Sequence, residues 1–219
     1  MIDEHIVKIL KVDVETHNVK RFIVEKPENY FFRRGQATNV SINSLRFRNE
    51  KRSFTFTSRP NEGVLEFIIK KYTNGITEKM HELKAGDELV IDGTFGYFEY
   101  KGKGTFIAGG TGITPFLGIF RSLEPEEVVK NKLFFFNKTH KDIICERELS
   151  EMLGDNALFS LTEEKRKGYL NKKANKTFLK KEIDDFTGYF YVCGPPGFVE
   201  SIKKNLVGLG VSEEKIIGG

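Results

Sequence analysis

A glycine-rich turn at residues 109–112 is the sharpest chemical feature of the sequence. Gly104–Ala108 has the pattern of a buried strand, Gly109-Gly110-Thr111-Gly112 follows directly, and Thr114-Pro115 lies at the start of a predicted helix. Glycines let a ligand approach the backbone closely, and free N–H groups at a helix N-terminus attract phosphate oxygens. Pro115 suits a first helical turn, where its missing N–H would have no partner. The pattern predicts a pyrophosphate-binding turn, or else a tight turn without a ligand.

A second turn with the same setting is Cys193-Gly194-Pro195-Pro196-Gly197. It follows the apolar run 189–193 and precedes a predicted helix at 198–206. In open α/β folds, ligands bind at the carboxyl ends of the parallel strands. Cys193 is therefore either a small core residue or a thiol that faces a ligand.

A third candidate is Arg52-Ser53-Phe54-Thr55, which lies on a predicted strand. Strand alternation puts Arg52 and Phe54 on one face and Ser53 and Thr55 on the other. On its own, an arginine on a strand face is most simply a solvated side chain.

The pattern of residues 1–100 predicts β-structure, and the third candidate lies on one of its strands. Alternating or apolar runs occur at 5–14, 19–26, 37–42, 52–57, 64–72 and 87–94, and turn residues separate them. A short helix fits 76–83. Many short strands at this spacing predict an antiparallel barrel or sandwich.

The rest of the chain alternates strands with helices. Strands are predicted at 104–108, 133–136, 157–161, 189–193 and 215–217, with helices at 113–123, 143–153, 178–183 and 198–206. Thr139–Asp142 resembles a capping box before the second of these helices. Such alternation predicts a parallel sheet with helical crossovers. The sequence thus predicts a β-barrel domain over 1–100 and an α/β domain over 101–219, with a hinge near 100–103.

Composition and charge exclude several classes. The chain has 219 residues, 39% hydrophobic and 30% charged, so a disordered or collagen-like protein is excluded. Two cysteines and four histidines without ligand spacing argue against a metal or iron–sulfur site. No membrane-length apolar run, signal-peptide pattern or nucleic-acid motif is found, so we expect a cytoplasmic protein that binds neither membrane nor nucleic acid. Eight basic residues and no acidic ones lie in 165–181, within a net charge of +4.

The order of the motifs resembles that of the ferredoxin–NADP reductase superfamily, and within it the compact bacterial flavodoxin/ferredoxin reductases. The resemblance covers nearly the whole chain and rests on five segments in the family's order: Arg52–Thr55, Asn74–Thr77, Gly93–Phe98, Gly109–Pro115 and Cys193–Pro196. It implies a six-stranded antiparallel β-barrel that binds FAD rather than FMN, followed by a Rossmann-like parallel α/β domain that binds NAD(P)H.

The resemblance also implies roles for residues of the barrel. Arg52 would pair with the flavin diphosphate, Phe54 would lie against the isoalloxazine ring, and Thr55 would hydrogen-bond near N5. Ser53 belongs to the same motif, and the turn Asn74-Gly75-Ile76-Thr77 would offer N–H groups and the Thr77 hydroxyl to the diphosphate. Phe54 stands for the family's Tyr, Asn74 for its Gly and Thr94 for its Pro, and the C-terminus at 215–219 lacks a closing aromatic. Asn tolerates left-handed backbone angles, so we expect the turn to form.

For the nucleotide, the resemblance implies that Gly109, Gly110, Thr111 and Gly112, with Thr114 and Pro115, hold the pyrophosphate. Cys193 would lie beside nicotinamide C4, with Gly194 and Pro195 shaping that pocket; Thr55 and Cys193 are the expected catalytic residues. The family's Ser-Arg pair for the 2′-phosphate of NADPH is replaced here by Thr162-Glu163. The Glu163 carboxylate would repel a phosphate, so NADH is favoured over NADPH, although Lys138 or the basic residues 165–167 could neutralise a phosphate.

The implied function is hydride transfer from NAD(P)H to bound FAD and electron transfer to a soluble acceptor, such as an acidic flavodoxin or ferredoxin, by a monomer. Two alternatives use the same fold: an NAD(P)H:free-flavin reductase and a non-catalytic scaffold subunit. Retention of flavin on purification would argue against the free-flavin reductase. Reduction of the bound flavin by a nicotinamide nucleotide would exclude the scaffold subunit.

Overall fold

The structure is a computed structural model that describes residues 4–96 and 98–218. The chain divides into two compact units. The first takes in the described residues up to 96 together with 117–122, and the second takes in 98–116 and the chain from residue 123 onward.

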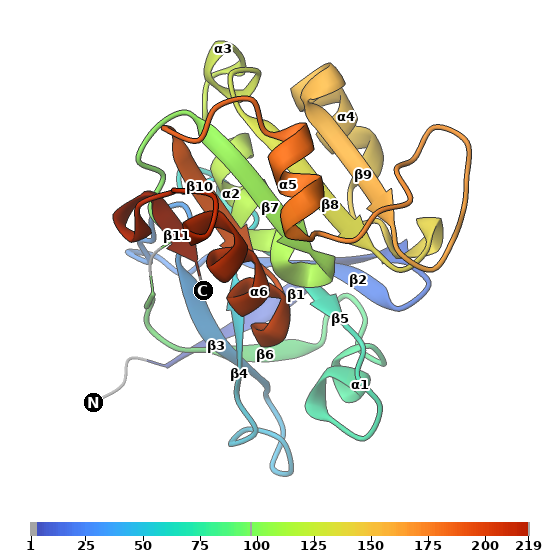
Figure 1. The fold of residues 1–219 in the computed structure, drawn as a ribbon. Coiled ribbons are helices and arrows are strands. Elements are labelled where there is room, and N and C mark those ends of the chain that lie inside the picture. The colour runs from blue at the N-terminus through green and yellow to red at the C-terminus, as the bar shows by residue number, and fades with distance from the viewer. Residues whose placement is uncertain (1–3, 97, 219) are drawn as a thin grey trace. The chain divides into compact units, whose positions relative to one another are not determined.

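The first unit is built on a six-stranded antiparallel sheet in the order β4-β3-β6-β1-β2-β5 (Figure 1). Its strands are β1 His5–Thr16, β2 Val19–Glu25, β3 Ala37–Ile42, β4 Arg52–Thr55, β5 Val64–Lys70 and β6 Glu88–Ile91, and the helix α1 spans Ile76–Met80. The two outer strands approach each other, because the Thr57 N–H just after β4 donates to the Glu66 carbonyl on β5 at 3.0 Å. This contact curls the sheet into the predicted barrel.

Inward-facing apolar side chains fill the barrel. Every strand except β4 contributes fully buried residues, which is why the alternation in the sequence locates the strands so well. The largest buried side chains of the barrel belong to Phe22 and Phe67 on its strands and to Phe56 directly after β4.

The second unit is a five-stranded parallel sheet in the order β11-β10-β7-β8-β9. Its strands are β7 Gly104–Gly109, β8 Lys132–Asn137, β9 Ala157–Leu161, β10 Tyr189–Cys193 and β11 Ile216–Gly218. Its helices are α2 Thr114–Arg121, which ends in the first unit, and α3 Pro125–Val128, α4 Glu146–Leu153, α5 Lys176–Glu182 and α6 Pro196–Val207. Together the two units confirm the predicted fold class.

The strand order reverses between β7 and β10. The chain runs outward from β7 to β8 and β9, then returns to β10 on the other side of β7. Parallel sheets bind ligands outside the carboxyl ends of the strands at such a reversal. Helices α5 and α6 lie on one face of this sheet (Figure 1), where they bury Phe134 and Phe136 of β8. The fold therefore points to the ends of β7 and β10.

Two local features differ from the sequence prediction. Thr139 and Asp142 do form a reciprocal capping box, but it caps the short 3₁₀ turn η2 His140–Asp142 rather than the helix predicted at 143–153. That helix, α4, begins only at Glu146, because Cys145 adopts a left-handed φ of 52°. The short helix α3 was not predicted; it begins at Pro125, which suits a first helical position.

Candidate functional site

The two glycine-bearing turns of the second unit pack backbone against backbone. A Cβ atom placed on Gly112 would lie 2.3 Å from the Cys193 carbonyl oxygen and 2.5 Å from the Gly194 nitrogen. A Cβ atom on Gly194 would lie 2.8 Å from the Phe198 ring. Only glycine fits at either position, so the structure brings together the two motifs that the sequence singled out.

The turn after β7 exposes bare backbone at the strand reversal. Gly110 has a φ of +54°, and the 3₁₀ turn η1 Gly110–Ile113 leads directly into α2. The Thr114 hydroxyl donates to the Thr111 carbonyl at 3.1 Å, which fixes the junction of turn and helix. Pro115 is the second residue of α2. A turn with little side-chain bulk that leads into a helix fits the pyrophosphate of a dinucleotide.

Cys193 is the last residue of β10 and pairs with Ala108 of β7. Burial raises the pKa of its thiol to about 11, an effect that the hydrogen bond with the Gly194 backbone partly offsets. The side chain is thus an uncharged thiol at neutral pH, at the edge where the two turns meet. It provides a small, polarizable surface there and no thiolate nucleophile.

The ends of β8 and β9 form the next part of this edge. The Glu163 N–H donates to the Lys138 carbonyl at 2.9 Å, and the Thr162 N–H and hydroxyl donate to the Asn137 carbonyl at 2.9 and 3.2 Å. Lys138 Nζ lies 3.0 Å from Glu163 Oε1, and both side chains are exposed. Lys138, which could neutralise a 2′-phosphate, and Glu163, which would repel one, are therefore paired with each other.

Glu146 joins the loop after β9 to the segment after β8, a role that sequence analysis missed. Its carboxylate accepts from the Tyr169 hydroxyl and lies 3.2 Å from His140 Nε2. The His140 N–H donates to Glu164 at 2.8 Å. Burial and this carboxylate raise the pKa of Tyr169 to about 12, so the phenol stays neutral and keeps its donor. No local pattern links residues so far apart in the chain.

The Arg52–Thr55 motif forms β4 of the first unit. Arg52 is exposed, and its guanidinium donates to the Lys51 carbonyl at 2.9 Å. The Ser53 hydroxyl donates to Asn39 Oδ1 at 2.9 Å, whereas Phe54 is half-buried against the barrel core. Thr55 is also half-buried at the end of the strand. An exposed guanidinium beside an aromatic ring can bind a phosphate group next to a flat heterocycle.

The turn at residues 74–77 has the left-handed conformation at Asn74 that the sequence predicted. Asn74 has a φ of 62°, the left-handed conformation that glycine would adopt there. Its N–H donates to Glu78 Oε2 at 3.0 Å, and Gly75 precedes α1. Ile76 is buried, and the Thr77 hydroxyl accepts from the Tyr72 N–H at 3.0 Å. The structure explains why asparagine replaces the family's glycine.

Two predicted segments are covered only in part. Gly93–Phe98 includes Tyr97 and the C-terminal segment 215–219 includes Gly219, and these two residues lie outside the described residues. In the remainder, Phe95 pairs with Ala37, and Gly96 has a φ of +64°.

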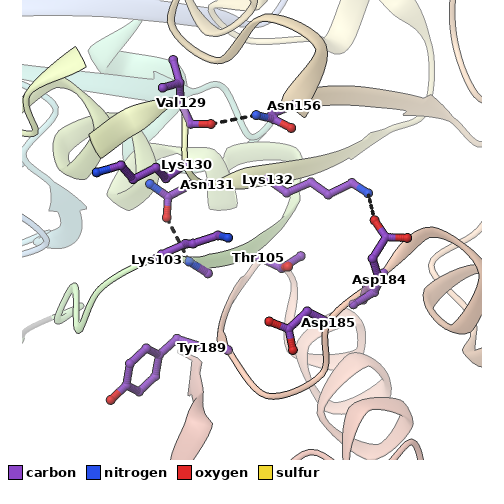
Figure 2. A pocket seen from close by; sticks show the side chains of 13 residues that line it. Lys103, Thr105, Val129, Lys130, Asn131, Lys132, Asn156, Asp184, Asp185 and Tyr189 are labelled. Atoms are coloured by element: carbon purple, nitrogen blue, oxygen red, sulfur yellow. Dashed lines mark hydrogen bonds and ion pairs between the residues drawn. The ribbon is translucent and has the colours of Figure 1, made fainter. Parts of the chain in front are cut away.

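A separate pocket of about 350 Å³ lies at the opposite, amino-terminal edge of the parallel sheet (Figure 2). Several of its polar groups are paired with one another. Lys132 lies 3.6 Å from Asp184, Asn131 accepts from the Gly104 N–H at 3.0 Å, and Asn156 donates to the Val129 carbonyl at 2.8 Å. These pairs hold the strand starts together, so we assign this pocket a structural role.

Two further observations concern metal ligands and membrane-spanning helices. Residues 4–96 and 98–218 contain no cluster of His, Cys, Asp and Glu side chains that could hold a metal ion. Within the same ranges, the helices are all too short or too polar to cross a bilayer.

Family models match both halves of the chain. One described as an oxidoreductase FAD-binding domain matches residues 7–100, and one described as an oxidoreductase NAD-binding domain matches residues 106–204. The two matches correspond to the barrel and to the parallel sheet. Both cofactor classes fit the residues described above: open space beside the Gly110 backbone in the turn after β7, and an exposed arginine with a half-buried phenylalanine two residues along β4.

Comparisons with individual proteins agree with the family models. The chain is 30% identical over 222 residues to the NADH-cytochrome b5 reductase 2 of Botryotinia fuckeliana, an alignment that covers 89% of this chain and 62% of that protein. It superposes with a TM-score of 0.89 and 19% identity on a ferredoxin NADP+ reductase from Neisseria gonorrhoeae solved with bound FAD and NADP, covering 100% and 99% of the two chains. The cytochrome b5 reductase domain of Ulva prolifera nitrate reductase gives 0.84 and 16%, covering 99% and 97%. At these identities, the two solved structures support the fold alone.

Proposed function

Because this chain belongs to the ferredoxin–NADP reductase superfamily, we propose that it is an FAD-dependent oxidoreductase that uses NAD(P)H to reduce a separate electron acceptor. The observation that carries this proposal is the close contact of Gly112 with Cys193 and Gly194. This contact brings the glycine turn and the small Cys193 side chain together at the strand reversal, the place where open α/β sheets bind dinucleotides.

In this proposal residues 101–219 bind the nucleotide and residues 1–100 bind FAD. The turn Gly109–Gly112 and the start of α2 donate N–H groups to the pyrophosphate, and Cys193, Gly194 and Pro195 orient the nicotinamide. Arg52 and the turn 74–77 hold the flavin diphosphate, Phe54 flanks the ring and Thr55 donates near N5. Bound FAD supplies the hydride acceptor. These residues contribute binding and orientation, which suffice because hydride transfer needs no protein acid or base.

We propose further that NADH is the preferred nucleotide. Glu163 brings a carboxylate to the strand end where a 2′-phosphate would lie, and the ion pair at 3.0 Å engages Lys138, one of the charges that could compensate. A phosphate would have to displace that carboxylate, whereas free ribose hydroxyls can donate to it. The name of the Botryotinia fuckeliana relative, an NADH-cytochrome b5 reductase, agrees with this preference.

The acceptor is proposed to be a small acidic one-electron carrier. The sequence suggested a flavodoxin or ferredoxin, and the names of the curated relatives add cytochrome b5 as a candidate.

A visible spectrum of the purified protein, followed by anaerobic titration with NADH and NADPH, tests this proposal. We expect a yellow protein that retains FAD through gel filtration, with its flavin bleached by either nucleotide and a kcat/KM at least several-fold higher for NADH. Glu163→Arg should shift the ratio toward NADPH by about tenfold, because it replaces repulsion of the phosphate by attraction.

Three outcomes would contradict the proposal. Turnover only with added flavin would identify a free-flavin reductase. A bound flavin that neither nucleotide reduces would exclude the enzyme. A tenfold preference of the unmodified protein for NADPH would overturn the assignment of Glu163 alone.

A further inference from the structure

Asn137 has an unusual environment for a buried amide. It is the last residue of β8, its exposed fraction is 5%, and neither Oδ1 nor Nδ2 has a hydrogen-bond partner among the described residues. Buried side-chain amides are nearly always paired, because an unpaired group loses its bonds to water and gains nothing in return. An amide in this position therefore calls for a specific explanation.

The face on which this amide lies follows from its neighbours in the strand. Phe134 and Phe136 point toward α5, since both contact the Phe178 ring, and Phe136 also contacts the Phe198 ring of α6. Alternation puts Asn137 on the opposite face, together with Phe135. Phe136 pairs with Gly109 in the sheet, and β8 contacts the turn η1. Asn137 thus lies at the carboxyl edge, at the end of a strand that contacts the glycine turn.

The backbone of Asn137 already belongs to the nucleotide-binding edge. Its carbonyl accepts both the N–H and the hydroxyl of Thr162, and the next residue, Lys138, pairs with Glu163. The unpaired amide is therefore one residue from the proposed 2′-position and one strand from the proposed pyrophosphate turn. A residue needed only for stability would gain from an apolar side chain of the same size here.

We infer that Asn137 contributes to nucleotide binding, because its amide gains its hydrogen-bond partners when a nicotinamide nucleotide binds over the glycine turn. The Nδ2 group would donate to a phosphate oxygen of the nucleotide, and Oδ1 would accept from a backbone N–H of the turn that the nucleotide reorients. Asn137 thereby gives up stability of the free protein for nucleotide affinity. This inference rests on the proposed function and adds a residue that neither the sequence motifs nor the family match assigns.

The test compares Asn137→Leu with the unmodified protein, because leucine keeps the size of the side chain and removes both polar atoms. Two quantities are measured: the thermal midpoint without nucleotide, and the Kd of NAD+ by calorimetry. We expect the midpoint to stay equal or rise, while the Kd weakens by about tenfold, the scale of one hydrogen bond. In turnover, the KM for NADH should rise by a similar factor and kcat should change less than threefold.

Ser41 provides a matched control. It lies on β3 of the first unit, and its hydroxyl is also buried without a partner among the described residues. Ser41→Ala should leave the Kd of NAD+ unchanged and the midpoint equal or higher. If Asn137→Leu does not fold, Asn137→Asp replaces the N–H donor by a carboxylate, and we expect it to weaken NAD+ binding at least as much.

An NAD+ affinity within twofold of the unmodified protein, in whichever of these two variants folds, would overturn the inference. A lower midpoint of Asn137→Leu together with unchanged affinity would make Asn137 a structural residue. These results are distinct from failure of the proposed function, in which the unmodified protein itself would not bind NAD+ or would not reduce its flavin.

Discussion

At the residue scale, the burial of Cys193 predicts how the reactivity of its thiol depends on pH. Burial disfavours the thiolate, so the pKa rises from the usual 9.0 to about 11 and the thiol remains protonated between these values. At pH 8 only about one molecule in a thousand carries the reactive thiolate, against about one in ten for an unperturbed thiol. Iodoacetamide should therefore alkylate Cys193 slowly, at a rate that still rises tenfold per pH unit between pH 8 and 10. NAD+ should slow it further.

The measurement uses Cys145→Ala, which leaves Cys193 as the only cysteine. The same variant in urea is the control, and its rate should level off near pH 9. A folded-state rate that also levels off near pH 9 would mean that burial does not control this thiol.

Two asparagines show what could and what could not be predicted from the sequence. Asn74 was predictable, because a left-handed turn position accepts few residue types and its φ of 62° matches one of them. Asn137 was not, because an asparagine at a strand end looks the same in sequence whether its amide is paired or not. Only the packing around it shows that both polar atoms are buried without a partner.

At the element scale, a buried ion pair joins β5 to the end of α2 within the first unit. Arg121 Nη1 lies 2.6 Å from Glu66 Oε1 and donates to the Thr57 carbonyl at 2.8 Å. The Arg121 and Glu66 side chains are only 11% and 12% exposed. Arg121→Met should leave the Glu66 carboxylate without its nearest cation and lower the free energy of unfolding by about 3 kcal/mol. The loss falls at the low end of the usual range because Arg21 remains 3.7 Å away.

Urea unfolding followed by circular dichroism measures this loss. Arg147→Met is the matched control, since Arg147 pairs with Glu151 along one helix but is 92% exposed. Its effect should be much smaller. Equal effects of the two substitutions would contradict the role given to burial.

The elements were predicted well where one residue pattern controls them. Alternation located the barrel strands, and apolar runs bounded by glycine and proline located the parallel strands. The start of α4 was placed too early because the capping box at Thr139–Asp142 is a local signal that serves the turn η2 equally well. The left-handed Cys145 and the Glu146 contacts to His140 and Tyr169 come from tertiary packing, which no local pattern encodes.

At the scale of the whole molecule, charge bears on the choice of acceptor. The net charge is +4, and residues 165–181 carry eight basic and no acidic side chains. Electrostatic attraction speeds the encounter with an acidic carrier and weakens as salt shortens the Debye length to about 8 Å at physiological ionic strength.

We expect kcat/KM for an acidic ferredoxin or flavodoxin to fall by about tenfold between ~20 and ~500 mM salt. A neutral quinone, used as the control acceptor, should change less than twofold, because it feels no such field. If the rate with the acidic carrier stayed constant or rose with salt while the quinone rate was unchanged, attraction would not drive that encounter, and an acidic partner would have to be abandoned.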